Sequence, residues 1–233
     1  MAKIKLAAFD LEGTVFKKIY RAMAGKEFES AWGALSSYLG ENAAREDEVN
    51  RNKYHKEGNY SYSNWVRDTI KIYQKYGLKK DCFDKMINSV EYHDGVAETF
   101  RELRNNGIIT ATISGGLKAL ADRVGLDHKV EHSFTSAELF WCPQGTLHHW
   151  NIIPTDFVHK RSVFEILLQE LGIDRSEAAF VGDGINDVDI AAHAGMSIAF
   201  NSKYEELKAV AHHTIDQRVG GQNLSAVLDF IIS

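Results

Sequence analysis

Four short runs of apolar residues predict the buried strands of this chain. They cover residues 3–9, 108–113, 178–181 and 196–200, and the first three end abruptly at polar or glycine-containing turns. Apolar runs of this length, bounded by turn residues, are typical of strands that are buried on both faces.

Between these runs, apolar residues recur at helical spacing. One such pattern covers residues 96–103 after an expected N-cap at Asp94, a second covers 163–171 before Gly172, and a third covers 224–231. Alternating strands and helices predict an α/β fold, a doubly wound parallel sheet with helices on both faces. Ligands bind such sheets beyond the carboxyl ends of the strands.

The segment 16–92 breaks this alternation. It shows helix signals over 28–39 and 66–73 but no convincing strand, and it holds eight of the nine tyrosines. We therefore expect an inserted helical domain at 16–92, and a core domain formed by residues 1–15 and 93–233.

Residues 127–157 follow neither pattern. Pro143 and Pro154 both fall here, together with Gly145, which favours a hairpin or an irregular excursion over a long helix.

Composition narrows the class of protein. The 233 residues are 44% apolar, with a formal net charge of −5. Such a chain buries a core, and its acidic balance disfavours nonspecific binding to nucleic acid or to an anionic membrane.

The sequence carries no mark of a disulfide framework, a membrane span or a signal peptide. Cys82 and Cys142 are too far apart for a CxxC site, and no apolar run is long enough to span a bilayer. The start MAKIKLAAFD is unlike a signal peptide. We expect a cytoplasmic protein of unknown oligomeric state.

Four carboxylates follow the predicted strands. Asp10 and Glu12 come after the first strand, and Asp183 and Asp187 come after the third. Since the carboxyl ends of parallel strands converge, these groups are expected to share one crevice. Oxygen ligands without histidine or cysteine favour Mg²⁺ over zinc.

The remaining strand ends suggest a phosphate site. Mg²⁺ usually binds one or two carboxylates together with a substrate phosphate. Ser114, Gly115 and Gly116 offer a hydroxyl and accessible N–H groups, which we expect at a helix N-terminus, and Lys160 adds a positive charge at the start of a helix. With the phosphate neutralised, Asp10 can attack phosphorus, and Glu12 can act as general acid and base.

The motifs DLEGT, SGG, a lysine opening a helix, and GDGIND occur here in the order typical of one family. The chain resembles the haloacid dehalogenase-like superfamily, and the insertion after the first motif resembles its phosphoserine phosphatase-like branch. The resemblance covers essentially the whole chain.

The resemblance implies a role for each motif residue. Asp10 is the nucleophile, and Glu12 is the general acid and base, which also binds Mg²⁺ through its backbone carbonyl. Ser114, Lys160 and the N–H group of Gly115 bind the phosphate, and Asn186 faces the phosphate or the substrate. Asp10 and Asp183 are metal ligands, Asp187 orients metal-bound waters or Lys160, and the insertion closes over the substrate.

Two positions depart from that pattern. Glu12 stands where the family usually has a second aspartate, and Ile19 stands where phosphoserine phosphatases have a glutamate that grips the amino acid. Phosphoserine specificity is therefore in doubt, and the aromatic-rich insertion suggests a more apolar or aromatic-stacked substrate. Arg51, Lys56 and Arg67 are candidate substrate contacts.

Two other clusters receive simpler interpretations. Adjacent residues of an extended segment point to opposite faces, so His148 and His149 do not make a metal site. The acidic run 46–48 is expected to be a solvated helix face.

Together these features predict a Mg²⁺-dependent phosphatase of a small phosphorylated metabolite that acts through an aspartyl-phosphate. Two alternatives remain open. One is a phosphotransferase that uses an alcohol acceptor, and the other is a weakly catalytic, Mg²⁺-binding regulatory protein.

Overall fold

The computed structural model describes residues 3–18, 20–21, 27–28, 30–56, 61–217 and 221–232. Its centre is a seven-stranded sheet with the order β6-β5-β4-β1-β7-β8-β9. All neighbouring strands are parallel except β5 and β6, which are antiparallel. The seven strands are β1 (Leu6–Phe9), β4 (Ile109–Leu117), β5 (His132–Trp141), β6 (Leu147–Ile152), β7 (Ala178–Gly182), β8 (Met196–Phe200) and β9 (His213–Ile215). The predicted α/β sheet is confirmed.

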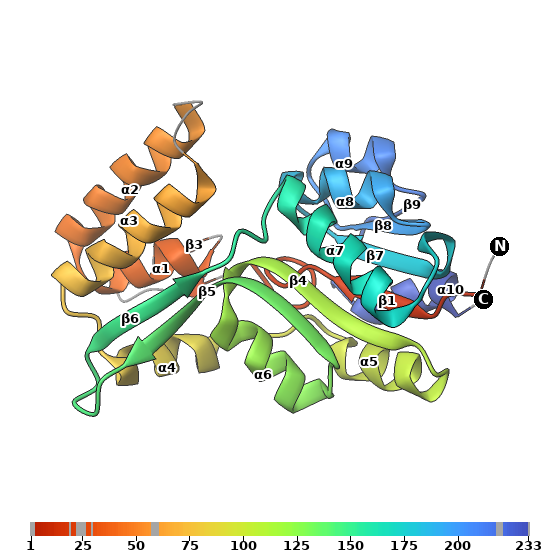
Figure 1. Ribbon diagram of the computed structural model, residues 1–233, viewed down its shortest axis with the longest axis horizontal. Helices are drawn as coiled ribbons and strands as arrows, with labels where there is room; N and C mark the ends of the chain where they lie inside the picture. Colours follow the sequence, from red (N-terminus) through yellow and green to blue (C-terminus); the bar gives the residue numbers. More distant parts are fainter. Residues whose placement is uncertain are drawn as a thin grey trace.

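Helices cover both faces of this sheet (Figure 1). On one face lie α5 (Val96–Asn105) and α6 (Lys118–His128), and on the other lie α7 (Val158–Leu171) and α8 (Val188–His193). Successive residues of β1 serve the two faces in turn, because Ala7 and Phe9 belong to one buried cluster and Leu6 and Ala8 to the other. The helices α9 (Glu205–Val210) and α10 (Leu228–Ile231) complete the C-terminal part, and the predicted helix over 224–231 is a 3₁₀ turn followed by α10.

The segment between β1 and α5 is mostly helical, as expected. It holds α1 (Ala31–Tyr38), α2 (Glu41–Lys56), α3 (Tyr62–Lys75) and α4 (Lys80–Ser89). It also contains the short antiparallel pair β2 (Tyr20–Arg21) and β3 (Glu27–Phe28), so the expectation that this segment has no strand was wrong. Two-residue strands are too short to show any alternation of apolar and polar residues.

The predicted hairpin in 127–157 is confirmed as β5 and β6. Figure 1 shows this hairpin reaching from the core towards α1, α2 and α3. The amide of Gln74, on α3, donates to the carbonyl of Leu147, on β6, at 3.4 Å. The hairpin therefore joins the helical segment to the edge of the sheet.

Three local predictions were wrong. Ser114, Gly115 and Gly116 lie within β4, where the register shifts, and α6 begins only at Lys118, so no helix N-terminus forms at Ser114. Gly95, and not Asp94, is the N-cap of α5. Asp47 is buried, and its carboxylate accepts a hydrogen bond from Thr69 of α3 at 3.1 Å, so the acidic run does not simply face solvent.

Cys82 and Cys142 are both free. Among the described residues, no helix combines the length and the apolar character needed to cross a bilayer.

Candidate active site

A buried lysine joins two carboxylates at the carboxyl edge of the sheet. Nζ of Lys160 lies 2.6 Å from Oδ1 of Asp10 and 2.6 Å from Oδ1 of Asp187. Asp10 follows β1 and Asp187 follows β7, and these strands are neighbours in parallel register. The sheet thus brings together residues that are distant in the sequence.

Asp183 completes a cluster of three buried carboxylates. One oxygen from each of Asp10, Asp183 and Asp187 lies within 4.8 Å of the others. Oδ2 of Asp183 pairs with the ammonium of Lys18 at 2.6 Å. The three carboxylates and the two ammonium groups together carry a formal charge of −1.

Burial governs the electrostatics of this cluster. It raises the pKa of Asp10 to about 8, while Lys160 acts in the opposite direction and Asp187 and Asp183 add to the rise. Burial likewise raises the pKa of Asp183, against the effect of Lys18. Although burial opposes its charge, the carboxylates of Asp10 and Asp187 hold the pKa of Lys160 above its usual range. A further cation would favour the ionised forms of Asp10 and Asp183.

Backbone geometry around the cluster depends on a glycine and on two amides. Gly13 has φ of +103°, and a Cβ on it would lie 2.4 Å from Oδ1 of Asp183. Oδ2 of Asp187 accepts the N–H groups of Asp183 and Gly184 at 3.0 and 2.8 Å. The turn after β7 therefore holds the carboxylate of Asp187, and Gly13 leaves room for the carboxylate of Asp183.

Glu12 lies apart from the carboxylate cluster. Its Oε1 accepts the backbone N–H of Ala31, at the start of α1, at 2.8 Å. Its Oε2 would lie 2.9 Å from a Cβ on Gly116, so it approaches the Ser114–Gly116 segment. Glu12 thus links the end of β1 to the helical segment.

The Ser114–Gly116 segment receives contacts from the helical segment as well. The hydroxyl of buried Ser114 accepts the N–H of Gly116 at 3.1 Å. The carbonyl of Gly115 accepts the indole N–H of Trp32 at 3.4 Å and the hydroxyl of Tyr62.

These groups border a cavity of about 220 Å³ between the sheet edge and the helical segment. Its lining includes the predicted residues Asp10, Glu12, Arg51, Ser114, Gly115 and Asn186, and also Gly116, Lys18, Ser30, Trp32, Tyr54, Tyr62, Trp65, Asp156 and Phe157.

Two charged lining residues were not predicted from the sequence. Lys18 pairs with Asp183, and Asp156 accepts the amide N–H of Asn186 at 2.6 Å. Asp156 precedes Lys160 by four residues, just before α7, and this position next to a predicted site lysine is the signal that could have identified it. The signal for Lys18 is weaker, because nothing around it in the sequence points to the turn after β7.

The candidate substrate contacts differ in their placement. Arg51 lines the cavity. Arg67 does not, and it binds Asn64 and Asp68 at 2.9 and 3.0 Å. The side chain of Lys56 and the whole of Ile19 lie outside the described part of the structure. His148 and His149 are exposed on β6.

Comparison with known proteins places the chain in a family. Residues 4–195 match haloacid dehalogenase-like hydrolases. The phosphoserine phosphatase of Lactococcus lactis is 27% identical over 197 residues, covering 83% of this chain and 86% of that protein. The phosphoserine phosphatase of Methanocaldococcus jannaschii is 26% identical, covering 81% and 86%.

A solved phosphoserine phosphatase, determined as an analogue of its phospho-aspartyl intermediate, has the same fold. It superimposes with a TM-score of 0.74 at 22% identity, covering 99% of this chain and 100% of that one. The resemblance inferred from the motifs is confirmed, and the chain belongs to the haloacid dehalogenase-like hydrolase family.

Proposed function

We propose that this hydrolase is a Mg²⁺-dependent phosphatase that cleaves a small phosphorylated metabolite through an aspartyl-phosphate on Asp10. The observation that carries the proposal is the buried cluster of Asp10, Asp183 and Asp187 around Lys160, at the edge of a cavity. Its curated relatives support the reaction class, because they are phosphoserine phosphatases.

The residues present fit a divalent metal. The donors are carboxylate oxygens, and the ammonium of Lys18 already pairs with Asp183, so the site accepts a positive charge. We propose Asp10, Asp183 and the backbone carbonyl of Glu12 as metal ligands, with Asp187 outside them. When bound, Mg²⁺ would neutralise the charge of the cluster and of the phosphate.

The proposed reaction has two steps. A carboxylate oxygen of Asp10 attacks phosphorus as the bond to the alcohol oxygen breaks, and water then cleaves the aspartyl-phosphate. Lys160 holds Asp10 in place and balances charge on the phosphoryl group, with Ser114 and the N–H group of Gly115 as further contacts. Asn186, which lines the same cavity, faces the substrate.

Glu12 is the proposed general acid and base. It gives a proton to the departing alcohol and then takes one from the attacking water. Its hydrogen bond to the N–H of Ala31 ties the position of this carboxylate to α1. We infer that segment 16–92 is the domain that closes over the substrate and excludes water.

A phosphotransferase or a weakly catalytic regulator is not favoured, since the family match is to hydrolases. A cytoplasmic location remains a prediction from the sequence.

Phosphate release tests the proposal. The protein is incubated with Mg²⁺ and a panel containing p-nitrophenyl phosphate, phosphoserine, and sugar and nucleotide phosphates. We expect turnover that a chelator suppresses, and loss of at least about 10³-fold in kcat for Asp10→Asn, because the covalent route is removed.

Asp122→Asn is the matched control. Asp122 is an exposed carboxylate that also pairs with a lysine, Lys118, at 2.7 Å, and its substitution is expected to leave turnover intact. Full activity of purified, folded Asp10→Asn would rule out Asp10 as the nucleophile. Acceptor-dependent transfer without phosphate release would instead favour the phosphotransferase.

A further inference from the structure

Asp156 is a half-buried carboxylate that the proposed reaction does not use. It lies in the turn before α7, outside the cluster of three aspartates. A Cβ on Gly115 would lie 2.5 Å from its carboxyl carbon, so the carboxylate packs directly against the Ser114–Gly116 segment. It therefore stands beside the proposed phosphate site, at the wall of the cavity.

Among the described residues, no ion pair cancels the negative charge of Asp156. Within the part of the chain that the structure describes, no lysine or arginine lies within 4.0 Å of this carboxylate, and its hydrogen bond from Asn186 is uncharged. Lys160 acts on it only at longer range, and burial raises the pKa of Asp156. A half-buried carboxylate without a cationic partner has lost part of its hydration, and a bound cation would stabilise its charge.

Aromatic rings form the wall near this carboxylate. Tyr54 contacts Trp65 with ring centroids 5.7 Å apart, and it contacts Phe157 at 6.3 Å. Tyr62 lies 5.5 Å from Trp65. After burial, the charge of Asp156 is the next cause that raises the pKa of Tyr54, to about 12, so the carboxylate is within electrostatic reach of the ring.

The turn that carries Asp156 and Phe157 has an unusual backbone. Phe157 adopts φ of +49°, which a residue with a side chain rarely takes. Such a strained conformation is unfavourable by itself and persists only where the surroundings fix it. Here it holds Asp156 and Phe157 in the lining of one cavity.

The two basic residues of the lining do not fill this role. Lys18 is committed to Asp183, and Arg51 is exposed on α2. Carboxylate oxygens and the faces of aromatic rings are the groups that recognise an ammonium ion, above all an alkylated one.

We propose that Asp156, with Tyr54, Tyr62, Trp65 and Phe157, forms a subsite for a cationic leaving group. The substrate would then be the phosphate monoester of a short alcohol that carries an ammonium or a quaternary ammonium group. This inference rests on the proposed phosphatase function and names the substrate class for the same site.

A pair of isosteric esters isolates the contribution of the positive charge. Phosphocholine and 3,3-dimethylbutyl phosphate have the same shape, but only the first carries a cationic head. We expect kcat/KM to be about 10-fold or more higher for phosphocholine. Phosphoethanolamine, assayed alongside, distinguishes a primary ammonium from a quaternary one, and a preference for either over the neutral ester supports the subsite.

Variants show whether Asp156 and the rings supply that preference. We expect Asp156→Asn to reduce the ratio of the two kcat/KM values to near 1, and Tyr54→Leu to lower it several-fold. A purely structural role of Asp156 would lower both rates together and leave the ratio unchanged. Asp122→Asn, on the surface, should keep the wild-type ratio.

The outcomes separate this inference from the proposed function. Equal rates for the charged and neutral esters, or an unchanged ratio in Asp156→Asn, overturn the subsite while leaving the phosphatase intact. If none of the esters is hydrolysed, p-nitrophenyl phosphate included, the proposed function fails. The subsite is then tested without turnover, by quenching of indole fluorescence with choline against 3,3-dimethylbutan-1-ol. Tighter binding of choline supports the subsite, and equal binding overturns it.

Discussion

Single residues control how closely the charged groups of this site approach one another. Gly13 and Gly115 leave room for the carboxylates of Asp183 and Asp156, and a Cβ on either would lie about 2.4–2.5 Å from an atom of the facing carboxyl group. Gly182 plays the same part for Asp187, whose Oδ2 would lie 2.5 Å from a Cβ there. Glycine at these positions thus permits a close approach of carboxylates, which cations such as the ammonium of Lys160 stabilise.

His93, where the chain returns from the helical segment, is expected to make stability depend on pH. Burial lowers the pKa of its imidazole to about 4, with Lys17 acting in the same direction and the backbone of Gly13 and the charge of Asp94 opposing. The unfolded chain, with an ordinary histidine pKa near 6.5, binds the extra proton first as the pH falls. The free energy of unfolding should therefore fall between about pH 6.5 and pH 4, and not above that window.

Urea unfolding at pH 7.0 and pH 4.5, with a chelator present, measures this effect. The expected contribution of His93 is a loss of about 2 kcal/mol, from about 1.4 kcal/mol for each unit of pKa shift. His93→Gln cannot titrate and should lose less stability between the two pH values. The other titrating groups contribute equally to both proteins and cancel in this comparison. The same loss of stability in both proteins would therefore contradict the assignment of this pH dependence to His93.

At the scale of elements, the parallel strands were the most predictable part of the fold. Strands buried on both faces are continuous apolar runs, and their carboxyl ends therefore located Asp10, Asp183 and Asp187 in the sequence. The pair β2 and β3 carries no such pattern, and the extension of β4 through Gly115 depends on pairing with β5. Asp156 and Lys18 acquire their positions only from tertiary contacts, which no local pattern encodes.

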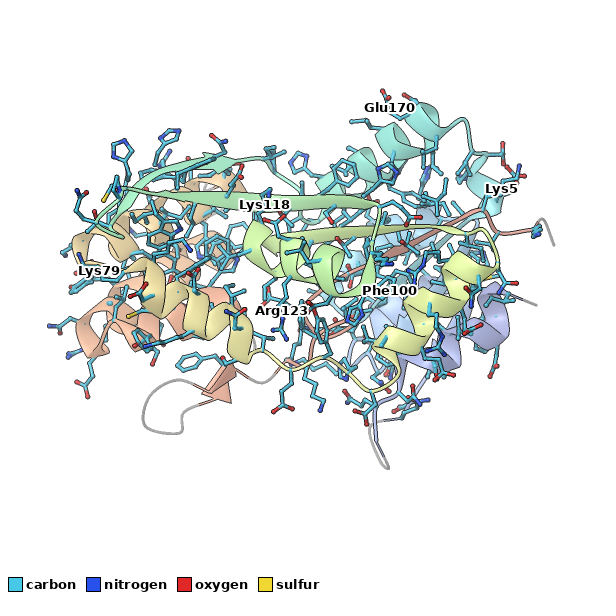
Figure 2. The ribbon with its side chains drawn as sticks, turned by 90° about the horizontal axis from the view of Figure 1, so that it is seen from below. Lys5, Lys79, Phe100, Lys118, Arg123 and Glu170 are labelled. Carbon is cyan, nitrogen blue, oxygen red and sulfur yellow. The ribbon has the colours of Figure 1, made fainter. Side chains whose placement is uncertain are left out.

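Arg123 links α6 to the end of α4 and to Tyr92 on one side of the sheet (Figure 2). From α6, its guanidinium donates to the carbonyls of Ile87 and Val90, at the end of α4, at 2.8 and 2.7 Å, and its Cζ lies 4.6 Å from the centroid of Tyr92. Arg123→Met would leave these carbonyls without their charged donor. We expect a loss of about 2–4 kcal/mol in the free energy of unfolding.

Chemical denaturation at constant pH measures this loss. Arg101→Met is the control, since Arg101 on α5 is exposed and, within the described part of the chain, forms an ion pair with its neighbour Glu102 alone. Its removal should cost less than about 0.5 kcal/mol. A similar small cost for Arg123→Met would show that the link between α4 and α6 contributes little.

For the whole molecule, the carboxylate cluster makes stability depend on a cation. Asp10, Asp183 and Asp187 come from two different strand ends, and Lys160 comes from a helix on one face of the sheet. Mutual repulsion at this junction acts against the packing of the sheet as a unit, and the two lysine ammonium groups leave a formal charge of −1. Part of the chain's excess of acidic residues thus lies at the ends of β1 and β7.

Binding of Mg²⁺ should therefore raise the thermal stability of the whole fold, because the metal binds the folded cluster and not the unfolded chain. At a concentration 100 times the dissociation constant, the expected gain is about 2.7 kcal/mol, or roughly 5–10 °C in Tm for a chain of this size. Differential scanning calorimetry with Mg²⁺, with a chelator, and with NaCl at equal ionic strength measures the effect. Asp183→Asn should lose most of the shift and Asp122→Asn should keep it, whereas an equal shift in both variants would place the binding site elsewhere.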